Sequence, residues 1–359
     1  MIFTMNRSDL QSAISAPSRI ASKSLVINTA CVLVTASTDH VTFEATDQTE
    51  SARCTQAALV DEQGSILIPA NSLASIIKTL PDEAVSVSSG DGSVRIVCGR
   101  ASFDLPALCP DDFPRFPTVD SSDSVSMPFD LFASMAKAAC SFAAKKDGGR
   151  EFAKGVHVVY DGLRLKMDAT DTYHIIRIVD QSDDVNGSSG FSATIPASFL
   201  GSAASAKFAS DAVLSASDNQ IQIACGNTTL ITRAINDNFP SIDAFFDFEV
   251  NARADFARDD LYGTIKRAVA VSPSDPVSIK IQDGSIDVSL SSQDKGAMHE
   301  SIDVTTDGMC TALANPSFLL DSLAAIDSER ASLVMDNPIN PFAIKNDTTA
   351  CVIMPVRRS

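Results

Sequence analysis

Residues 191–211 read FSATIPASFLGSAASAKFASD, a short apolar strand that runs through a proline into an alanine-rich helix. Two further stretches, 64–84 (GSILIPANSLASIIKTLPDEA) and 308–329 (GMCTALANPSFLLDSLAAIDSE), have the same pattern. Proline in the first turn of a helix costs little, because its missing N–H would have no intrahelical partner. The prolines are 127 and 120 residues apart (196−69 and 316−196): Pro69, Pro196 and Pro316. One strand-to-helix unit therefore occurs three times.

Other landmarks recur at nearly the same period, which indicates an internal repeat. The letters ATD at 45–47 return at 169–171, and DFPRF at 112–116 returns as NFPSI at 238–242. One third of the 359 residues is a common size for a domain with its own core. The sequence therefore predicts three similar domains, which are 1–120, 121–250 and 251–359. The segments 109–126 and 237–255 are expected to link them.

Each third reads as helix, strands, helix, strands, which predicts an α+β fold with two helices packed on antiparallel sheets per domain. In the first third, Ser8 can cap a helix that Pro17 is expected to end. Residues 25–36 and 39–47 then read as the two β-rich arms of a hairpin. Further helices are expected at 130–144, 196–210, 259–271 and 316–329, and a second hairpin at 84–99 that turns at 90–92.

The composition is that of a globular protein, with 45% hydrophobic residues and a net charge of −17. No window reaches the length of a membrane span, the N-terminal residues lack the pattern of a targeting signal, and the eight cysteines are spread singly. These features predict a cytoplasmic protein with no membrane partner. The negative charge leaves two interpretations open. In the first, the protein has no nucleic-acid role; in the second, its few basic residues share one face and contact DNA locally.

No constellation typical of catalysis is present. The sequence lacks the phosphate-binding and nucleophile motifs, and the four histidines are too scattered to suggest a metal site. Asp47 and Asp171 invite comparison with a catalytic carboxylate pair, but they occupy equivalent positions of two repeats. That equivalence favours a role in a turn or a cap. We therefore expect no cofactor, no metal and no enzyme activity.

Four segments together carry a resemblance to a known family: ATDTYHI at 169–175, DDFPRFP at 111–117, NFP at 238–240 and the terminal ACVIMPVRRS at 350–359. On a threefold repeat of this length, the chain resembles the bacterial β sliding clamp, the processivity factor of DNA polymerase III. The resemblance covers the whole chain. It departs from the family pattern where Thr172, Tyr173 and His174 stand in place of Gly, His and Arg, so partner preference is expected to differ. A phage-encoded or divergent member is as compatible with these letters as a housekeeping one.

The resemblance implies a DNA clamp fold in which two subunits close into a ring around duplex DNA, without sequence preference. The ring tethers the replicative DNA polymerase, is handled by a clamp loader, and performs no chemistry. The implied DNA contacts lie on inward helices and loops: Arg19, Lys23, Lys78, Lys137, Lys145, Lys146, Arg150, Lys266 and Arg267. The alternative for each is a solvated surface base, and helix capping alone could account for Lys266 and Arg267.

Two protein interfaces are also expected. The edge strand of the first domain, with Phe103 and Leu105, would meet the third domain of a second copy near Ala270 and Val271. The ATDTYHI segment, the turn at 240–245 and the tail would line one apolar pocket for short partner peptides rich in Gln and Leu, which the polymerase, the loader and other proteins with such motifs share. The pocket residues would be Thr170, Thr172, Tyr173, His174, Ile175, Pro240, Phe245, Val352, Met354, Pro355, Val356 and Arg357. The alternative for this set is plain interdomain core.

A different class of protein stays open at this point. A three-domain, β-rich structural or assembly protein, such as a virion component, could share the repeat without encircling DNA. The terminal motif argues against it, and an enzyme is the least favoured reading because no activated nucleophile or acid–base pair is present.

Overall fold

The computed structural model describes residues 1–90, 92–120, 123–145, 149–188, 190–206, 208–217 and 219–357. Its contacts divide the chain into two compact units. Unit 1 comprises Met1–Phe129 and Lys207–Ala234, and unit 2 comprises Asp130–Ala206 and Ile235–Ser359. The predicted central domain thus contributes residues to both units, and the division into three domains stays a prediction.

Unit 1 contains two antiparallel sheets whose strands are listed here in the order of their hydrogen-bonded neighbours. The first is β5 (Leu59–Glu62), β1 (Ile2–Asn6), β7 (Ala84–Gly90), β8 (Ser93–Cys98) and β9 (Ala101–Pro106). The second contains β10 (Ser124–Met127), β16 (Ala212–Ala216), β17 (Gln220–Cys225), β18 (Thr228–Arg233), β4 (Glu50–Ala57), β3 (His40–Thr46), β2 (Cys31–Ala36) and β6 (Gly64–Pro69). Because β18 pairs with β4, strands from the middle third of the sequence extend the sheet of the first third.

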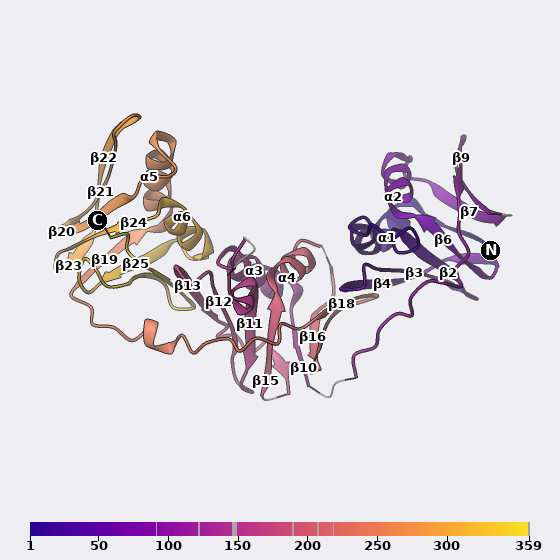
Figure 1. Cartoon of the computed structure of the whole chain (residues 1–359), viewed down its shortest axis with the longest axis horizontal. Coiled ribbons are helices and arrows are strands. Elements are labelled where there is room, and N and C mark those ends of the chain that lie inside the picture. Colours follow the sequence, from indigo (N-terminus) through magenta and orange to yellow (C-terminus); the bar gives the residue numbers. More distant parts are fainter. Residues whose placement is uncertain are drawn as a thin grey trace. The chain divides into compact units, whose positions relative to one another are not determined.

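Helices α1 (Arg7–Ala21) and α2 (Ala70–Thr79) pack side by side in unit 1 (Figure 1). The prediction that Pro17 ends α1 is wrong, because the helix continues for four residues beyond it. An internal proline removes one hydrogen bond at a cost of about 3 kcal/mol. The turn that contains Pro17 and the following turn bury Ile20 and Ala21 against the core, which offsets this cost.

Residues 25–30 also differ from expectation, since they form turns rather than a strand, and β2 begins at Cys31. The apolar run suggested a strand, but Leu25 and Ile27 point into solvent with 101% and 74% of their surface exposed. A β-rich run becomes a strand only where a neighbour pairs with it. The hairpin of β2 and β3 is otherwise as predicted, and β7 pairs with β8 around a turn whose residue 91 lies outside the described residues.

Unit 2 also contains two antiparallel sheets. One runs β15 (Phe191–Pro196), β11 (Gly155–Tyr160), β12 (Leu165–Thr170), β13 (His174–Val179), β27 (Thr349–Ile353), β26 (Phe342–Lys345), β25 (Arg330–Met335), β19 (Ala252–Ala257) and β23 (Thr305–Asp307). The other runs β22 (Gly296–Asp303), β21 (Ser285–Ser292), β20 (Val277–Gln282) and β24 (Cys310–Ala314). The C-terminal strand β27 therefore lies between β13 and β26, with Ile175 opposite Val352.

The helices of unit 2 are α3 (Phe129–Ser141, whose first residue belongs to unit 1), α4 (Ala197–Ala204), α5 (Arg258–Val271) and α6 (Pro316–Ala325). Helices α5 and α6 pack together (Figure 1). Helix α3 approaches α4 closely at Gly201, where an added Cβ would lie 3.7 Å from Cys140 Sγ. The three predicted strand-to-helix units are confirmed as β6–α2, β15–α4 and β24–α6, although α4 and α6 end several residues before 210 and 329. Within the described ranges, no helix is long and apolar enough to cross a membrane.

Candidate partner-binding site

The ATD segment of unit 2 forms a closed turn between β12 and β13. Asp171 Oδ1 accepts the backbone N–H groups of Tyr173 at 2.8 Å and His174 at 2.9 Å. Thr170 Oγ1 donates to His174 O at 2.8 Å and accepts from Thr172 N at 2.9 Å. Thr172 has a φ of 79°, in the left-handed region where a β-branched residue is strained. The predicted turn role of Asp171 is confirmed.

The same turn recurs in unit 1 between β3 and β4. Asp47 Oδ1 accepts from Thr49 N at 2.9 Å and from Glu50 N at 2.7 Å, while Gln48 has a φ of 74°. Asp47 is therefore also a turn residue, as its repeat position predicts. The recurrence of ATD reflects one hydrogen-bonding pattern used twice.

His174 is the most enclosed polar side chain of the site, at 2% exposure. Its ring stacks between Phe142, the residue that follows α3, and Phe318 of α6, with both centroid distances 4.3 Å. Nδ1 lies 2.7 Å from Asp171 Oδ1, and Nε2 has no hydrogen-bond partner and lies 3.9 Å from Asp321 Oδ2. The carboxylate can only accept, so Nδ1 carries a proton, and Nε2 holds a lone pair when the ring is neutral.

The two carboxyl groups beside His174 differ in their electrostatics. Burial alone would raise the pKa of Asp171, but the hydrogen bonds from His174 and from Tyr173 N outweigh it, and the pKa is lowered from its usual value. Burial raises the pKa of Asp321, against the opposing charges of Lys145 and His174. Asp171 is therefore fixed as a turn acceptor, whereas Asp321 is a carboxyl group whose charge is poorly compensated.

The C-terminal tail is attached to this turn. Met354 N donates to Tyr173 O at 3.0 Å, and Val356 N donates to Leu313 O at 2.7 Å. Tyr173 is 64% exposed and Val356 39% exposed, with Met354 and Pro355 half-buried beside them. The turn and the tail thus form one exposed surface, which we call the Tyr173–Val356 surface. Arg357, also exposed, follows it.

The next residue, Ile175, lies on the opposite face of the sheet from His174. It belongs with Val352 and Ile242 to a separate buried cluster, against which Phe246 and Met354 pack. Val352 is fully buried there, and Thr170 is buried inside the turn, so neither offers side-chain surface to a partner. Pro240 and Phe245 are exposed on the chain that leads into and through the short helix η2 (Asp243–Phe245).

The predicted single pocket is therefore divided in two by the sheet. Successive residues of a strand point to opposite faces, so His174 and Ile175 cannot line the same cavity. The helix side holds a pocket of about 830 Å³, which we call the Asp321 pocket. Its lining is Ser141, Ala143, Ala144, Lys145, Gly149, Arg150, Ala153, Asp171, Thr172, Tyr173, His174, Ser317, Phe318 and Asp321.

The sequence analysis did not assign Phe142, Phe318 and Asp321 to the site. Residues in or just after a helix that pack on a distant turn carry no local sequence pattern that points to that contact. Arg177 was also missed; it pairs with Asp168 at 2.9 Å and with Asp243 at 2.8 Å. This arrangement fastens the 235–251 segment to the outer face of the sheet. The arginine was visible in the sequence, but its partner lies 66 residues away (243−177).

Comparison with known proteins decides the family. The model of the DNA polymerase III beta subunit N-terminal domain matches residues 1–117, and that of its C-terminal domain matches residues 248–357, together well over half of the chain. The chain belongs to the β sliding clamp family, the β subunits of DNA polymerase III. Its function is that of a DNA sliding clamp, and its fold is the DNA clamp fold.

Individual relatives agree with this placement. The chain is 27% identical to the beta sliding clamp of Chlamydia pneumoniae, over 91% of this chain and 90% of that protein. The beta subunit of DNA polymerase from Streptococcus pyogenes has the same fold, with a TM-score of 0.92 and 23% identity over the full length of both chains. A sliding clamp of Pseudomonas aeruginosa, solved bound to griselimycin, matches with a TM-score of 0.91 and 18% identity, again over both full lengths.

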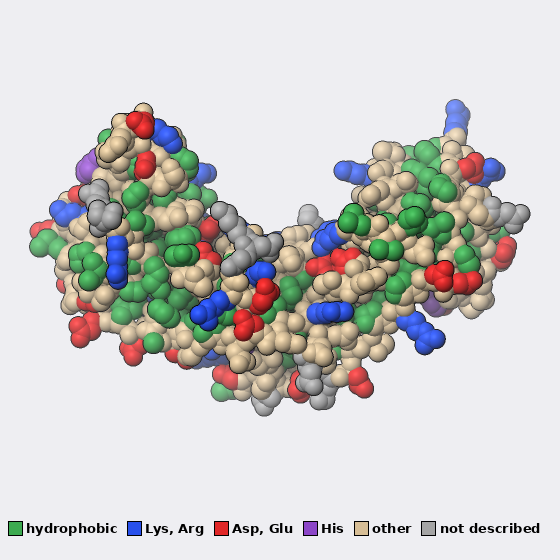
Figure 2. All heavy atoms as spheres, in the orientation of Figure 1, with side chains coloured by type: hydrophobic (Ala, Val, Ile, Leu, Met, Phe, Trp, Pro, Cys, Tyr) green, Lys and Arg blue, Asp and Glu red, His purple; other side chains and the backbone are tan. Residues whose placement is uncertain are grey.

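The basic residues predicted from the sliding clamp resemblance have diverse surroundings. Lys23 pairs with Glu50 at 2.7 Å, and Arg267 pairs with Glu300 of β22. Lys266 lies over the Tyr262 ring. The others are placed as follows: Arg19 half-buried in the last turn of α1, Lys78 and Lys137 exposed on α2 and α3, Lys145 and Arg150 in the lining of the Asp321 pocket, and Lys146 outside the described residues. Figure 2 shows Lys and Arg as separate spots with acidic side chains between them on the face in view.

The residues expected at the clamp's dimer contact lie at sheet edges or beside them. Strand β9, with Phe103 and Leu105 half-buried, ends its five-stranded sheet, and β22 ends the four-stranded sheet of unit 2. Ala270 is exposed near the end of α5, and Val271 packs partly against the core. Each edge strand has one side without a partner strand in the described part of the chain.

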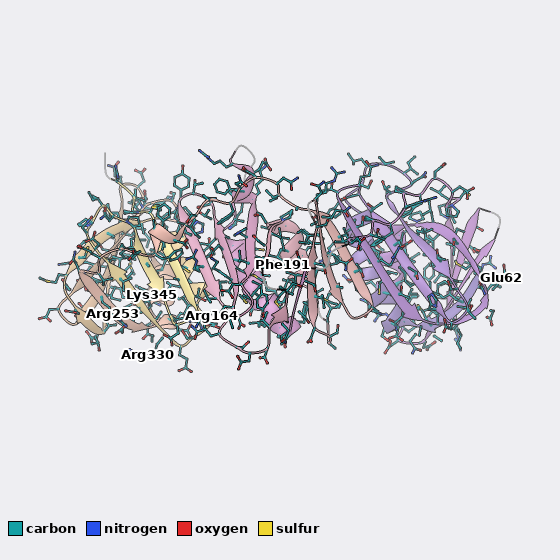
Figure 3. The ribbon with its side chains drawn as sticks, turned by 90° about the horizontal axis from the view of Figure 1, so that it is seen from below. Glu62, Arg164, Phe191, Arg253, Arg330 and Lys345 are labelled. Atoms are coloured by element: carbon teal, nitrogen blue, oxygen red, sulfur yellow. The ribbon has the colours of Figure 1, made fainter. Side chains whose placement is uncertain are left out.

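A second pocket, of about 600 Å³, contains none of the predicted site residues. Arg330 and Lys345 line it, and Arg253 lies on the same side of unit 2 (Figure 3). Asp255, another lining residue, pairs with Arg253 at 2.9 Å. Among the described residues no group of three or more His, Cys, Asp or Glu side chains could hold a metal ion.

Proposed function

We propose that this sliding clamp works as a homodimeric ring that encircles duplex DNA, tethers the replicative DNA polymerase, and offers the Tyr173–Val356 surface to partner peptides. The observation that carries the proposal is the hydrogen bond from Met354 N to Tyr173 O, because it joins the tail to the ATD turn. This contact holds apolar side chains of both segments together at the surface. The clamp loader and other proteins with short apolar motifs would share this surface with the polymerase.

The role we propose is non-catalytic. His174, the one histidine near a carboxylate pair in this site, is enclosed by two rings, and Asp171 is occupied by turn N–H groups. An acid–base pair must reach a substrate to act on it. Asp171 and His174 Nδ1 are engaged with each other and with the turn, which supports a role of this pair in holding the turn.

Ring closure would join β9 of one subunit to β22 of its partner. Both strands are sheet edges with unpaired backbone groups, and edges of this kind pair with another chain unless they are protected. Phe103 and Leu105 would pack near Ala270 and Val271 at each joint. A head-to-tail contact repeated twice closes the ring. We also propose three clamp domains, 1–120, 121–250 and 251–359, supported by the matches at 1–117 and 248–357.

The proposed hold on DNA is topological, because the net charge of −17 disfavours strong phosphate binding. Of the proposed contacts, Lys23 and Arg267 are already paired with acids, which weakens their attraction for phosphate. Lys78 and Lys137 are exposed and better placed to touch DNA. Weak contacts of this kind permit sliding.

Retention on circular DNA tests the ring. The clamp is incubated with nicked circular duplex and washed at high salt, and half of the sample is then cut once. We expect clamp to stay on the uncut circle and to leave the linear product. Equal retention on both, or tight binding to short linear duplex at physiological salt, would contradict topological binding.

Removal of the tail tests the peptide surface. A chain ending at Ile353 keeps β27, whose buried residues hold the sheet together, and loses residues 354–359. We expect a labelled peptide rich in Gln and Leu to bind the full chain with micromolar affinity, about −8 kcal/mol. The shortened chain should bind it about tenfold more weakly with an unchanged melting temperature. Unchanged affinity would remove the tail from the site.

A further inference from the structure

The Asp321 pocket contains two hydrogen-bond acceptors that face each other without a donor. Asp321, 30% exposed on α6, has no hydrogen-bond partner in the described ranges. His174 Nε2, 3.9 Å away, is buried and equally unpartnered. Two close acceptors without a donor are unfavourable, because His174 Nε2 is buried away from water and Asp321 is only partly exposed to it. The arrangement favours a ligand that brings a donor, and above all a cationic one.

The remaining charges of the pocket do not supply that donor. Asp171 Oδ1 already accepts three N–H groups, from the backbone of Tyr173 and from the backbone and ring of His174. Lys145 and Arg150 line the pocket but are exposed, and neither forms an ion pair with Asp321 in the part of the chain that the structure describes. The pocket therefore has two exposed bases and, beside His174, an acid that pairs with neither of them in the described ranges.

The apolar lining suits the stem of a long basic side chain. Phe318 presents its ring beside His174, and Ala143, Ala144 and Ala153 supply small apolar surfaces. Lys and Arg side chains commonly bury their methylene stems along such surfaces and direct the charged head to an acid. Tyr173 lines the same pocket while its carbonyl holds Met354. The pocket is thus continuous with the Tyr173–Val356 surface.

We propose that the Asp321 pocket takes a Lys or Arg side chain of the partner peptide, whose charged head pairs with Asp321 while its stem packs on Phe318. The inference rests on the proposed peptide surface and deepens it by naming a residue class that partners carry. Asp321 is the specificity-determining residue. The neutral His174 ring beside Asp321 offers this carboxylate no donor from Nε2.

The test compares labelled peptides that share the same apolar residues and differ at one position. A series places Arg, its neutral isostere citrulline, or Glu at each position flanking the apolar residues, and affinities are measured by fluorescence anisotropy. We expect at least one position at which Arg exceeds citrulline by about fivefold on the wild-type clamp. Asp321→Asn, a near-isosteric change, should abolish that ratio without changing the citrulline affinity. Asp183→Asn removes an exposed acid of the loop after β13, outside the pocket and the proposed dimer contact, and should leave the ratio intact.

The outcomes separate the two proposals. If no peptide of the series binds, the proposed peptide surface fails. If all bind and Arg never exceeds citrulline, the surface stands and the inference is overturned. A preference for Glu would show that Lys145 and Arg150 govern the pocket instead.

Discussion

At the scale of single residues, the two ATD turns impose a left-handed conformation at the position after the aspartate. Thr172 and Gln48 occupy it with φ values of 79° and 74°. Hydrogen bonds to Asp171 and Thr170 hold Thr172 there, although a β-branched side chain is disfavoured in this region. The glycine expected at this position from the family pattern has no Cβ and meets no such penalty.

Thr172→Gly should therefore stabilise the protein. The change relieves the left-handed strain and keeps the Thr172 N–H bond to Thr170, so the free energy of unfolding should rise by about 1 kcal/mol. Urea denaturation measures it. Thr172→Ala serves as the control and should gain less, because alanine retains a Cβ. An equal gain in both variants would place the effect in the hydroxyl or the branching rather than in the backbone.

Asp321 gives a pH-dependent prediction. Its pKa is raised by burial, so the folded state holds this proton more tightly than the unfolded state does. The contribution of Asp321 to stability is therefore greatest at low pH and is lost as pH rises through the raised pKa. Asp321→Asn should raise the melting temperature at about pH 7.5, and the gain should shrink towards about pH 4. A gain that grows on acidification would contradict this assignment.

At the scale of elements, α1 and α5 each begin with an arginine. Each of these arginines donates to carbonyl groups at the C-terminal end of the helix that packs beside it, α2 or α6. Arg7 donates to Ile77 O at 3.2 Å and to Lys78 O at 2.9 Å, at the end of α2. Arg258 donates to Ile326 O at 3.2 Å, just beyond α6. Terminal carbonyls of a helix have no intrahelical partner, and a cation there also suits the helix dipole. The equivalent position of α3 is Phe129, which contacts Phe208 instead.

Arg7→Ala should lower the free energy of unfolding by about 1 to 2 kcal/mol, because it leaves Lys78 O without a protein donor and Ile77 O with only the N–H of Leu80, at 3.4 Å. Lys78→Ala removes a charge from the same end of α2 and should cost less than about 0.5 kcal/mol, since the Lys78 side chain is exposed. Chemical denaturation monitored by circular dichroism compares them. Similar losses in both variants would show that charge at the helix end matters and the specific contacts do not.

At the scale of the whole molecule, the proposed ring depends on strands that end their sheets. Ala270 is exposed, so a charge placed there would destabilise an interface at this position without disturbing the core. Ala270→Asp should turn the proposed dimer into a monomer in light scattering at micromolar concentration, with an unchanged melting profile for the subunit. Ser134→Asp, on the exposed side of α3, should remain dimeric. A dimer that persists in Ala270→Asp would place the joint away from α5.

Much of this protein follows from the sequence, because its strongest signals are local. The three proline-marked strand-to-helix units, the helix of 259–271 and the ATD turns depend on neighbours a few residues apart, and all are present in the structure. The terminal segment was recognisable by its apolar alternation: residues 349–353 form β27, and backbone hydrogen bonds from Met354 and Val356 hold the chain beyond it. The repeat and these motifs together also indicated the family, which the comparisons establish.

Tertiary structure decided what depends on partners distant in the chain. Whether 25–30 forms a strand, whether Pro17 ends a helix, and which sheets receive β18 and β27 are settled by packing and pairing across tens to hundreds of residues. The same holds for the site. The segment ATDTYHI predicted one pocket. In the structure, His174 lies between Phe142 and Phe318 on one face of the sheet, and Ile175 lies with Val352 on the other. A sequence fixes the alternation of a strand, but the elements that cover each face determine what each side chain meets.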